Sequence, residues 1–154
     1  MSQQLHQLKR LERLRAASER LHQAVYARAQ QAASTAQAER HANLQQRDAT
    51  VDASHHSLSG GNWTEWWMGE STLALIDRHR EHIEQICDQR EQQVEASQSA
   101  LSRAHRGHEQ AKLLLELARE RARYAEERRS QATSDDRFAA RAHWLQQQER
   151  VKES

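Results

Sequence analysis

Residues 73–125 read LALIDRHREHIEQICDQREQQVEASQSALSRAHRGHEQAKLLLELARERARYA. Two series of residues seven apart run through this stretch: Leu73, Arg80, Cys87, Val94, Leu101, His108, Leu115 and Ala122, and Ile76, Ile83, Arg90, Ser97, Ala104, Ala111, Ala118 and Ala125. Twelve of these sixteen residues are apolar, against 36% of the whole chain. A spacing of 3.5 residues held this long is typical of a helix that buries a narrow stripe against a second helix. We therefore predict a long coiled-coil helix here.

The composition also favours a thin helical structure. The chain has 154 residues, of which 36% are apolar and 29% charged, with a single Phe, no Pro and four Gly. Such a chain has too few apolar side chains for a thick core, and little in it interrupts a helix. Because a slim helix pair has no room for an enclosed pocket, we expect a mechanical or adhesive function.

A first helix is predicted over about residues 3–51. Its apolar residues recur at steps near three, four or seven, with a leucine-rich start and an alanine-rich middle: Leu5, Leu8, Leu11, Leu14, Leu21, Val25, Ala29, Ala32, Ala36 and Leu44. At 1.5 Å per residue this helix would be roughly 70 Å long. We expect these residues to form its amphipathic face.

The break between the helices is predicted at residues 52–62. The segment is Ser-rich and ends in Gly60 and Gly61, the clearest helix breaker in the chain. Asn62 followed by Glu65 is typical of a capping box, so a second helix should begin at Trp63. It should extend to about Arg129.

The C-terminal residues are predicted to be less regular. Residues 130–136, SQATSDD, favour a fray or kink, followed by a short helix or tail over residues 134–154. This last part carries Phe138 and Trp144, and it is either an amphipathic docking helix or a frayed tail. The predicted fold is therefore all-α: a long antiparallel two-helix coiled coil, or helical hairpin, with unequal arms, forming a single domain over residues 1–154.

Charge and cysteine usage favour a cytoplasmic protein that does not bind nucleic acid. The 23 basic and 22 acidic residues are interspersed, without the basic face that nucleic-acid binders present. Residues 8–20 have a mild basic bias, which indicates either a solvated face or a site for an acidic partner. The single cysteine, Cys87, lies on the predicted seam and fits a reducing compartment. No apolar run is long enough to span a bilayer, so no direct membrane insertion is expected.

Three of the four tryptophans form a cluster with a methionine at Trp63, Trp66, Trp67 and Met68. At helical spacing Trp63 and Trp67 share a face that Trp66 does not, so one seam cannot bury all three. The cluster is either a plug that closes the tip of the hairpin or an exposed anchor for another protein, because Trp is enriched at binding hot spots.

Four seam positions are polar: Arg80, Arg90, Ser97 and His108. Buried polar residues fix the register of a coiled coil at a cost in stability. Alternatively, the partner helix leaves the stripe at these positions and the seam is open there.

Metal and catalytic signals are weak or missing. The paired histidines, His55 with His56 and His79 with His82, lack a nearby cysteine or a convincing carboxylate partner. Gly60 and Gly61 are not followed by the Lys and Ser or Thr of a phosphate-binding loop, and there is no nucleophile elbow. We therefore expect no enzymatic activity, no metal and no cofactor.

Several features together resemble a known family. They are the Pro-free length, the break before Asn62 and Trp63, the Ile-x-x-His-Arg-x-x-Ile stretch at residues 76–83, and the sequence Asp-Arg-Phe-Ala at residues 136–139. This pattern resembles the FliJ/YscO family, the coiled-coil proteins of flagellar and injectisome type III secretion. The first helix has Ala42, Gln45 and Gln46 where flagellar members carry aromatic residues, which favours an injectisome relative.

The resemblance implies a central stalk that inserts into the hexameric export ATPase, activates it and contacts the cytoplasmic domain of the export-gate protein. Export chaperones are further possible partners. The protein would be a monomer when free and would lie in the cytoplasm, at the inner-membrane secretion apparatus. By resemblance, the ATPase would contact residues near both chain ends: Leu8, Arg10, Leu11, Arg13, Leu14, Arg121 and Phe138. The gate or another partner would contact the tip half: Trp63, Trp66, Trp67, Met68, Leu75 and His79.

Two other functions remain open. The seam could instead join several copies of the chain into a homo-oligomeric scaffold. The exposed aromatic residues could also hold an export substrate, as in a secretion chaperone or adaptor.

Overall fold

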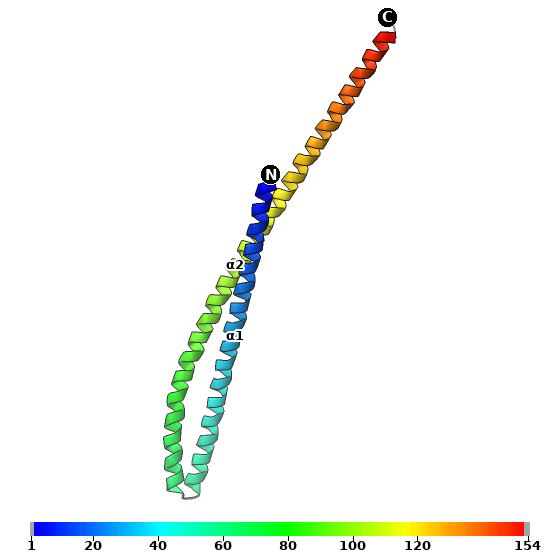
Figure 1. Ribbon diagram of the computed structural model, residues 1–154. Coiled ribbons are helices and arrows are strands. Elements are labelled where there is room, and N and C mark those ends of the chain that lie inside the picture. Colours follow the sequence, from blue (N-terminus) through cyan, green and yellow to red (C-terminus); the bar gives the residue numbers. More distant parts are fainter. Residues whose placement is uncertain (1, 153–154) are drawn as a thin grey trace. The chain divides into compact units, whose positions relative to one another are not determined.

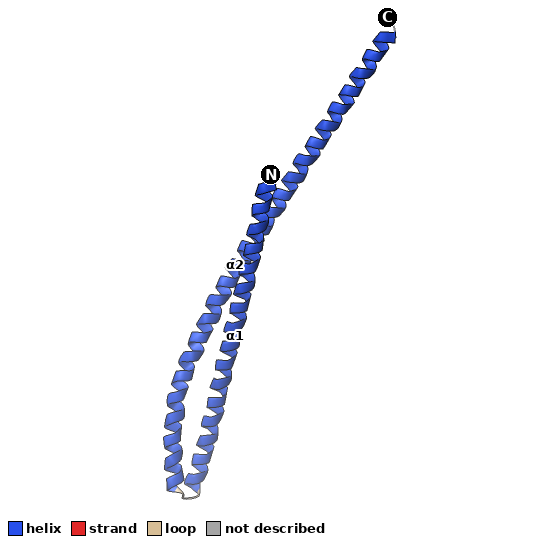
Figure 2. Ribbon diagram, viewed as in Figure 1, coloured by secondary structure: helices blue, strands red, loops and turns tan. Residues whose placement is uncertain are grey.

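A computed structural model describes residues 2–152 as two α-helices (Figure 1). Helix α1 is Ser2–Ser59, of 58 residues, and helix α2 is Trp63–Lys152, of 90 residues. Only residues 60–62 of the described chain lie outside a helix (Figure 2). The fold is therefore all-α, an antiparallel helical hairpin with arms of unequal length, as the heptad pattern predicted.

The chain divides into two compact units. Unit 2 is Ala17–Arg106 and contains the turn, with the helix parts on either side of it packed antiparallel. Unit 1 consists of residues 2–16 of α1 and of α2 from Gly107 onward.

The seam on α2 follows the predicted heptad positions. Ile76, Ile83 and Cys87 are buried in unit 2, and Ala111 and Leu115 are buried in unit 1. Of the sixteen predicted seam residues, only Arg80 and Arg90 are exposed. The two arginines therefore do not control register from within the seam. Their long charged side chains reach solvent at the edge of the stripe.

The predicted apolar face of α1 is half correct. Leu5, Leu8, Ala29 and Ala32 are half-buried, and Ala36 is buried. Leu11, Leu14, Leu21, Val25 and Leu44 are all exposed. The covered positions of α1 follow a heptad pair that shares only Leu5, Leu8, Ala29 and Ala36 with the predicted face. The pair is mostly polar and consists of Leu5, Glu12, Glu19, Tyr26, Ala33, Arg40, Arg47 and Ser54, and of Leu8, His22, Ala29, Ala36, Asn43, Thr50 and Ser57. Several of the exposed apolar residues lie one position away from this pair. Because one helix can bury only a narrow stripe against a single partner, they remain on its flank.

Small side chains let the helices of unit 2 approach closely. Ser54 of α1 is buried against Gly69 of α2, where a Cβ atom would overlap the Ser54 hydroxyl. About five helical turns further along the seam, Ala36, Ile83 and Cys87 form a buried cluster, and the Cys87 Sγ lies 3.5 Å from the Ala36 carbonyl oxygen. This packing needs glycine, alanine, serine and cysteine at the facing positions.

The turn is shorter than predicted. Helix α1 continues to Ser59 instead of ending near Val51, because its serines are compatible with a helix: the Ser59 Oγ donates to the His55 carbonyl oxygen at 2.6 Å. Gly61 then adopts a left-handed conformation, with φ at 76°. The amide of Asn62 donates to the Ser57 carbonyl oxygen at 2.9 Å and that of Gly61 to Leu58 at 3.1 Å. This is the Schellman arrangement for ending a helix, and it depends on glycine.

The predicted cap of α2 is half confirmed. The Glu65 amide donates to the Asn62 Oδ1 at 3.3 Å, as in a capping box. The reciprocal bond is missing because the Asn62 amide already serves the end of α1. The Glu65 carboxylate instead accepts a bond from the Ser57 Oγ at 3.2 Å.

Helix α2 also continues without a break through residues 130–136, where a fray or kink was predicted. The segment lacks glycine and proline, and its serines, threonine and aspartates each disfavour a helix by less than about 1 kcal/mol. The Thr133 Oγ1 donates to the Arg129 carbonyl oxygen at 2.9 Å, which is compatible with an unbroken helix.

The close approach at Gly69 predicts opposite effects for one substitution at two glycines. Gly69→Ala should lower the free energy of unfolding by about 1–2 kcal/mol, because the new methyl group overlaps Ser54. Gly107→Ala should raise it by about 0.5–1 kcal/mol, because a Cβ there would meet only ordinary contacts with Arg15 and alanine favours a helix. Urea unfolding followed by circular dichroism measures both. Changes of the same sign would refute the proposed packing.

Candidate protein-binding surfaces

Polar pairs bridge the helices within each unit and align them. In unit 2, Arg47 Nε lies 3.0 Å from Asp77 Oδ1, and Arg40 Nε lies 3.1 Å from Glu84 Oε1. Such half-exposed pairs contribute at most about 1 kcal/mol each, so their main effect is to disfavour other registers.

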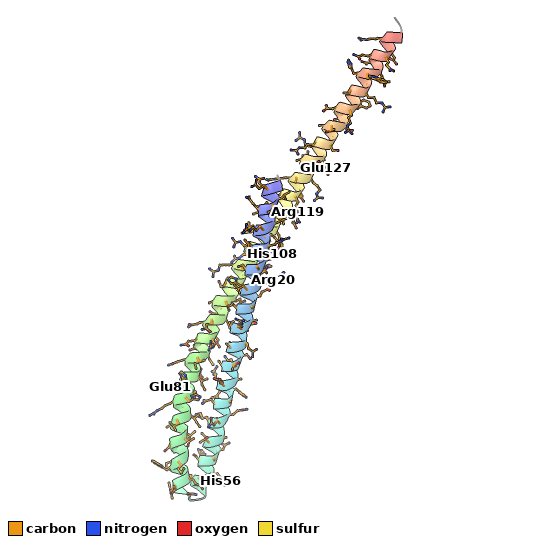
Figure 3. All side chains as sticks on the ribbon, in the orientation of Figure 1. Arg20, His56, Glu81, His108, Arg119 and Glu127 are labelled. Atoms are coloured by element: carbon orange, nitrogen blue, oxygen red, sulfur yellow. The ribbon has the colours of Figure 1, made fainter. Side chains whose placement is uncertain are left out.

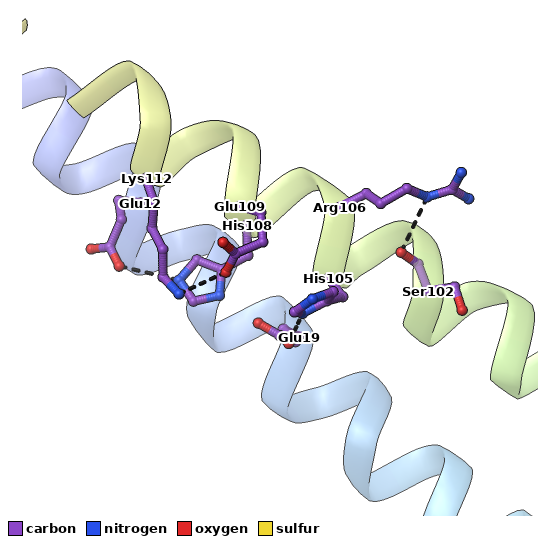
Figure 4. A network of polar contacts seen from close by, with 8 residues as sticks. All are labelled: Glu12, Glu19, Ser102, His105, Arg106, His108, Glu109 and Lys112. Carbon is purple, nitrogen blue, oxygen red and sulfur yellow. Dashed lines mark hydrogen bonds and ion pairs between the residues drawn. The ribbon is translucent and has the colours of Figure 1, made fainter. Parts of the chain in front are cut away.

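Histidine–glutamate pairs lie further along the seam (Figure 4). His105 Nδ1 is 2.7 Å from Glu19 Oε1 in unit 2, and His108 Nε2 is 3.2 Å from Glu12 Oε1 in unit 1. His108 is thus a polar seam residue that bonds across the helices, as register control requires. Ser97 instead donates to the carbonyl oxygen of Val94 in its own helix at 3.0 Å.

The described residues contain no group of three or more His, Cys, Asp or Glu side chains that could hold a metal ion. Burial raises the pKa of the Cys87 thiol above its ordinary value, and nearby acidic side chains, including Glu84, raise it further against the opposing effect of Arg40. A buried thiol kept neutral in this way is a poor nucleophile. Within the described part of the chain, no helix is long and apolar enough to cross a membrane.

An apolar open surface lies in unit 1. A groove of about 480 Å³ runs between the start of α1 and the facing part of α2, and its lining is formed by Gln4, Leu5, Gln7, Leu8, Leu11, Leu114, Leu117, Ala118 and Arg121. We call this the leucine groove. Leu11 is 37% exposed, Leu114 51% and Leu117 50%. Exposed leucines gathered on one side of a helix pair are typical of a site where a further helix packs.

The structure brings together part of the expected ATPase-binding set. Leu8, Leu11 and Arg121 line the leucine groove. Arg10, Arg13 and Leu14 are exposed on α1 outside the groove lining, and Phe138 is exposed further along α2. Sequence reasoning missed Leu114 and Leu117. The run of three leucines at residues 113–115 was a usable signal, because a narrow seam can bury only one of them.

A second apolar surface lies at the turn in unit 2. Trp63, Trp67 and Met68 are each 60% exposed or more, and Leu58 at the end of α1 is 41% exposed. We call these four residues the tip surface. Trp66 is half-buried on the seam side and makes an edge-to-face contact with Trp63, with ring centroids 6.1 Å apart. Of the other residues expected to contact a partner, Leu75 and His79 are also exposed, on the next turns of α2.

The side chains of α2 beyond Ala125 form a third open region. Every described side chain from residue 126 to 150 is exposed, including those of Phe138 and Trp144 (Figure 3). Glu127, labelled in the figure, lies near its start.

The comparisons with known proteins identify no relative. No protein-family model, curated protein or solved structure matches this chain significantly. Function must therefore be argued from the three open surfaces.

The leucine run at residues 113–115 provides a matched test of this surface. Leu115 is 5% exposed, so Leu115→Ala should lower the free energy of unfolding by about 2–5 kcal/mol. Leu114 is half exposed, so Leu114→Ala should change it by less than about 1 kcal/mol. Chemical unfolding of the two variants measures both values. If Leu114→Ala lowered the free energy of unfolding more than Leu115→Ala, Leu114 would be the buried seam residue and the assignment of the two leucines would be wrong.

Proposed function

We propose that the protein is a non-enzymatic stalk of a type III secretion apparatus. In this proposal unit 1 binds and activates the hexameric export ATPase, and the tip surface contacts the cytoplasmic domain of the export gate. The protein would act in the cytoplasm, at the inner-membrane apparatus. The sequence resemblance to the FliJ/YscO family supplies the partners, and the exposed surfaces supply the means of binding them.

One observation carries the ATPase part of the proposal. Leu8, Leu11 and Arg121, three residues that the resemblance assigns to ATPase binding, line the same groove although Arg121 lies far from the two leucines in sequence. Apolar side chains beside an arginine are a favourable combination at interfaces, where Arg and buried apolar anchors contribute much of the binding energy. A ring-shaped ATPase could cover this groove from outside, since the leucines already face solvent.

The rest of the surface fits a stalk. The charges are nearly balanced and interspersed, with 23 basic and 22 acidic residues, so no large single-sign field holds the helices to a ring of either charge. A narrow seam of small residues keeps the helix pair slim. These properties also suit a coiled-coil spacer, so the proposal depends on the leucine groove.

The ATPase test uses the purified hexameric export ATPase from the same source. Adding the chain should increase ATP turnover. The double variant Leu117→Ala/Arg121→Ala should bind the ATPase at least about tenfold more weakly, because it truncates one apolar wall of the groove and removes its cation. Leu44→Ala is the matched control, since Leu44 is an exposed leucine of unit 2 outside the groove. No stimulation by the unmodified chain, or equal affinities for both variants, would refute the proposal.

The tip surface also favours a second candidate function, that of a secretion chaperone or adaptor. Trp67→Ala/Met68→Ala should weaken binding of the gate's cytoplasmic domain at least about tenfold if the tip contacts the gate. Trp144→Ala, which removes an exposed tryptophan of unit 1, is the control. Calorimetric titration measures each affinity. If this double variant bound the gate normally but no longer bound a helical export client, the adaptor function would be favoured over the gate contact.

A further inference from the structure

The exposed part of α2 carries an uncovered heptad line. Residues spaced by seven on one face are Leu117, Tyr124, Gln131, Phe138 and Leu145. Four of these five are large apolar or aromatic residues, between 48% and 78% exposed. A heptad line of this kind is typical of a coiled-coil face, and beyond Ala125 no part of α1 covers it.

An alanine line runs beside it and continues the seam of unit 1. Ala111 is buried against α1, and Ala118 and Ala125 are half-buried. The same line proceeds through Ala132 and Ala139, which are exposed. The alanine spacing of the unit 1 seam therefore continues along α2 beyond the last residue that α1 covers. Alanines there allow a second helix to approach closely.

We propose that the part of α2 between about residues 121 and 145 pairs with the same part of a second copy of the chain, in antiparallel orientation. The two-fold axis lies near residues 133–134. The charges select this occupant and this orientation. Glu127 and Arg141 flank the apolar line on the same side, and an antiparallel pair places each Glu127 beside the Arg141 of the second copy. A parallel pair in register places Glu127 beside Ala132 and gains no ion pair.

The other layers of this pairing are mixed. Next to the two-fold axis, Gln131 meets Asp135 of the second copy in a polar layer. Tyr124 meets Ala142 of the second copy, so that a large residue faces a small one. Phe138 meets Arg128, whose guanidinium can stack on the aromatic ring. On the other flank, Ala132 lies opposite Ala132 of the second copy and Ala139 lies opposite its Ala125. Because the interface is short and partly polar, we expect a weak dimer with a Kd on the order of 100 µM, so that the monomer dominates at low concentration.

The pairing has a regulatory consequence that rests on the proposed function. Arg121 and Phe138 are expected ATPase contacts and also lie in or beside the paired face. A dimer and an ATPase complex would then exclude each other, and self-association at high local concentration would keep the stalk from the ATPase. The pairing itself needs no ATPase to be tested, so its failure is distinguishable from failure of the proposed function.

Sedimentation velocity of the full chain, from about 10 µM to about 1 mM, tests the pairing. The unmodified chain should shift from monomer to dimer over this range. Glu127→Arg and Arg141→Glu should each raise the dissociation constant by about tenfold, since both symmetric ion pairs become repulsive. An equimolar mixture of these two variants should dimerise again, because each chain then carries charge opposite to its partner at both positions.

The substituted side chains are exposed, and circular dichroism of each variant checks that the helices are retained. The double variant Glu127→Arg/Arg141→Glu restores both pairs and should dimerise like the unmodified chain. A monomer at every concentration would overturn the proposal. A dimer that is insensitive to Glu127→Arg, or a mixture of the single variants that stays monomeric, would overturn the antiparallel pairing.

Discussion

The close contact between small residues on the two helices determines how unit 2 is built. Ser54 packs against Gly69 and Ala36 packs against Cys87, so the backbones approach to a distance that larger side chains would prevent. Buried apolar area is small at such a seam, and shape complementarity fixes which residues can face each other. Ion pairs such as Arg47 with Asp77 add little to the stability of the helix pair, and their main effect is to disfavour alternative registers.

The seam also determines which side chains remain available for binding. Because the covered stripe of α1 is largely polar or small, most of its leucines lie outside the seam, and in unit 1 Leu11 lines one groove together with Leu114 and Leu117 of α2. Large exposed apolar patches commonly mark interaction sites. The tip surface extends the same principle to unit 2, where Trp63 and Trp67 remain open while Trp66 turns toward the seam.

The sequence was sufficient for the fold and for the seam of α2, because a strict heptad of apolar residues is a direct record of what one helix face buries. For α1 the sequence predicted only part of the covered stripe, because Leu11, Leu14 and Leu21 fit the apolar pattern and yet are exposed. Glu12, Glu19 and Arg40 cannot be recognised as seam residues from hydrophobicity, since their partners His108, His105 and Glu84 lie on the other helix. Leu11 and Arg121 likewise line one groove only because the two helices are aligned antiparallel there.

Hydroxyl-radical footprinting of leucine side chains, in the free chain and with the export ATPase hexamer, would test most directly whether the groove is a binding surface. Leu11, Leu114 and Leu117 should be oxidised readily in the free chain and protected in the complex. Leu115, which is buried in the seam, should react slowly in both. Protection of the groove leucines in the free chain would contradict the arrangement of the helices, and unchanged oxidation in the complex would contradict the proposed docking.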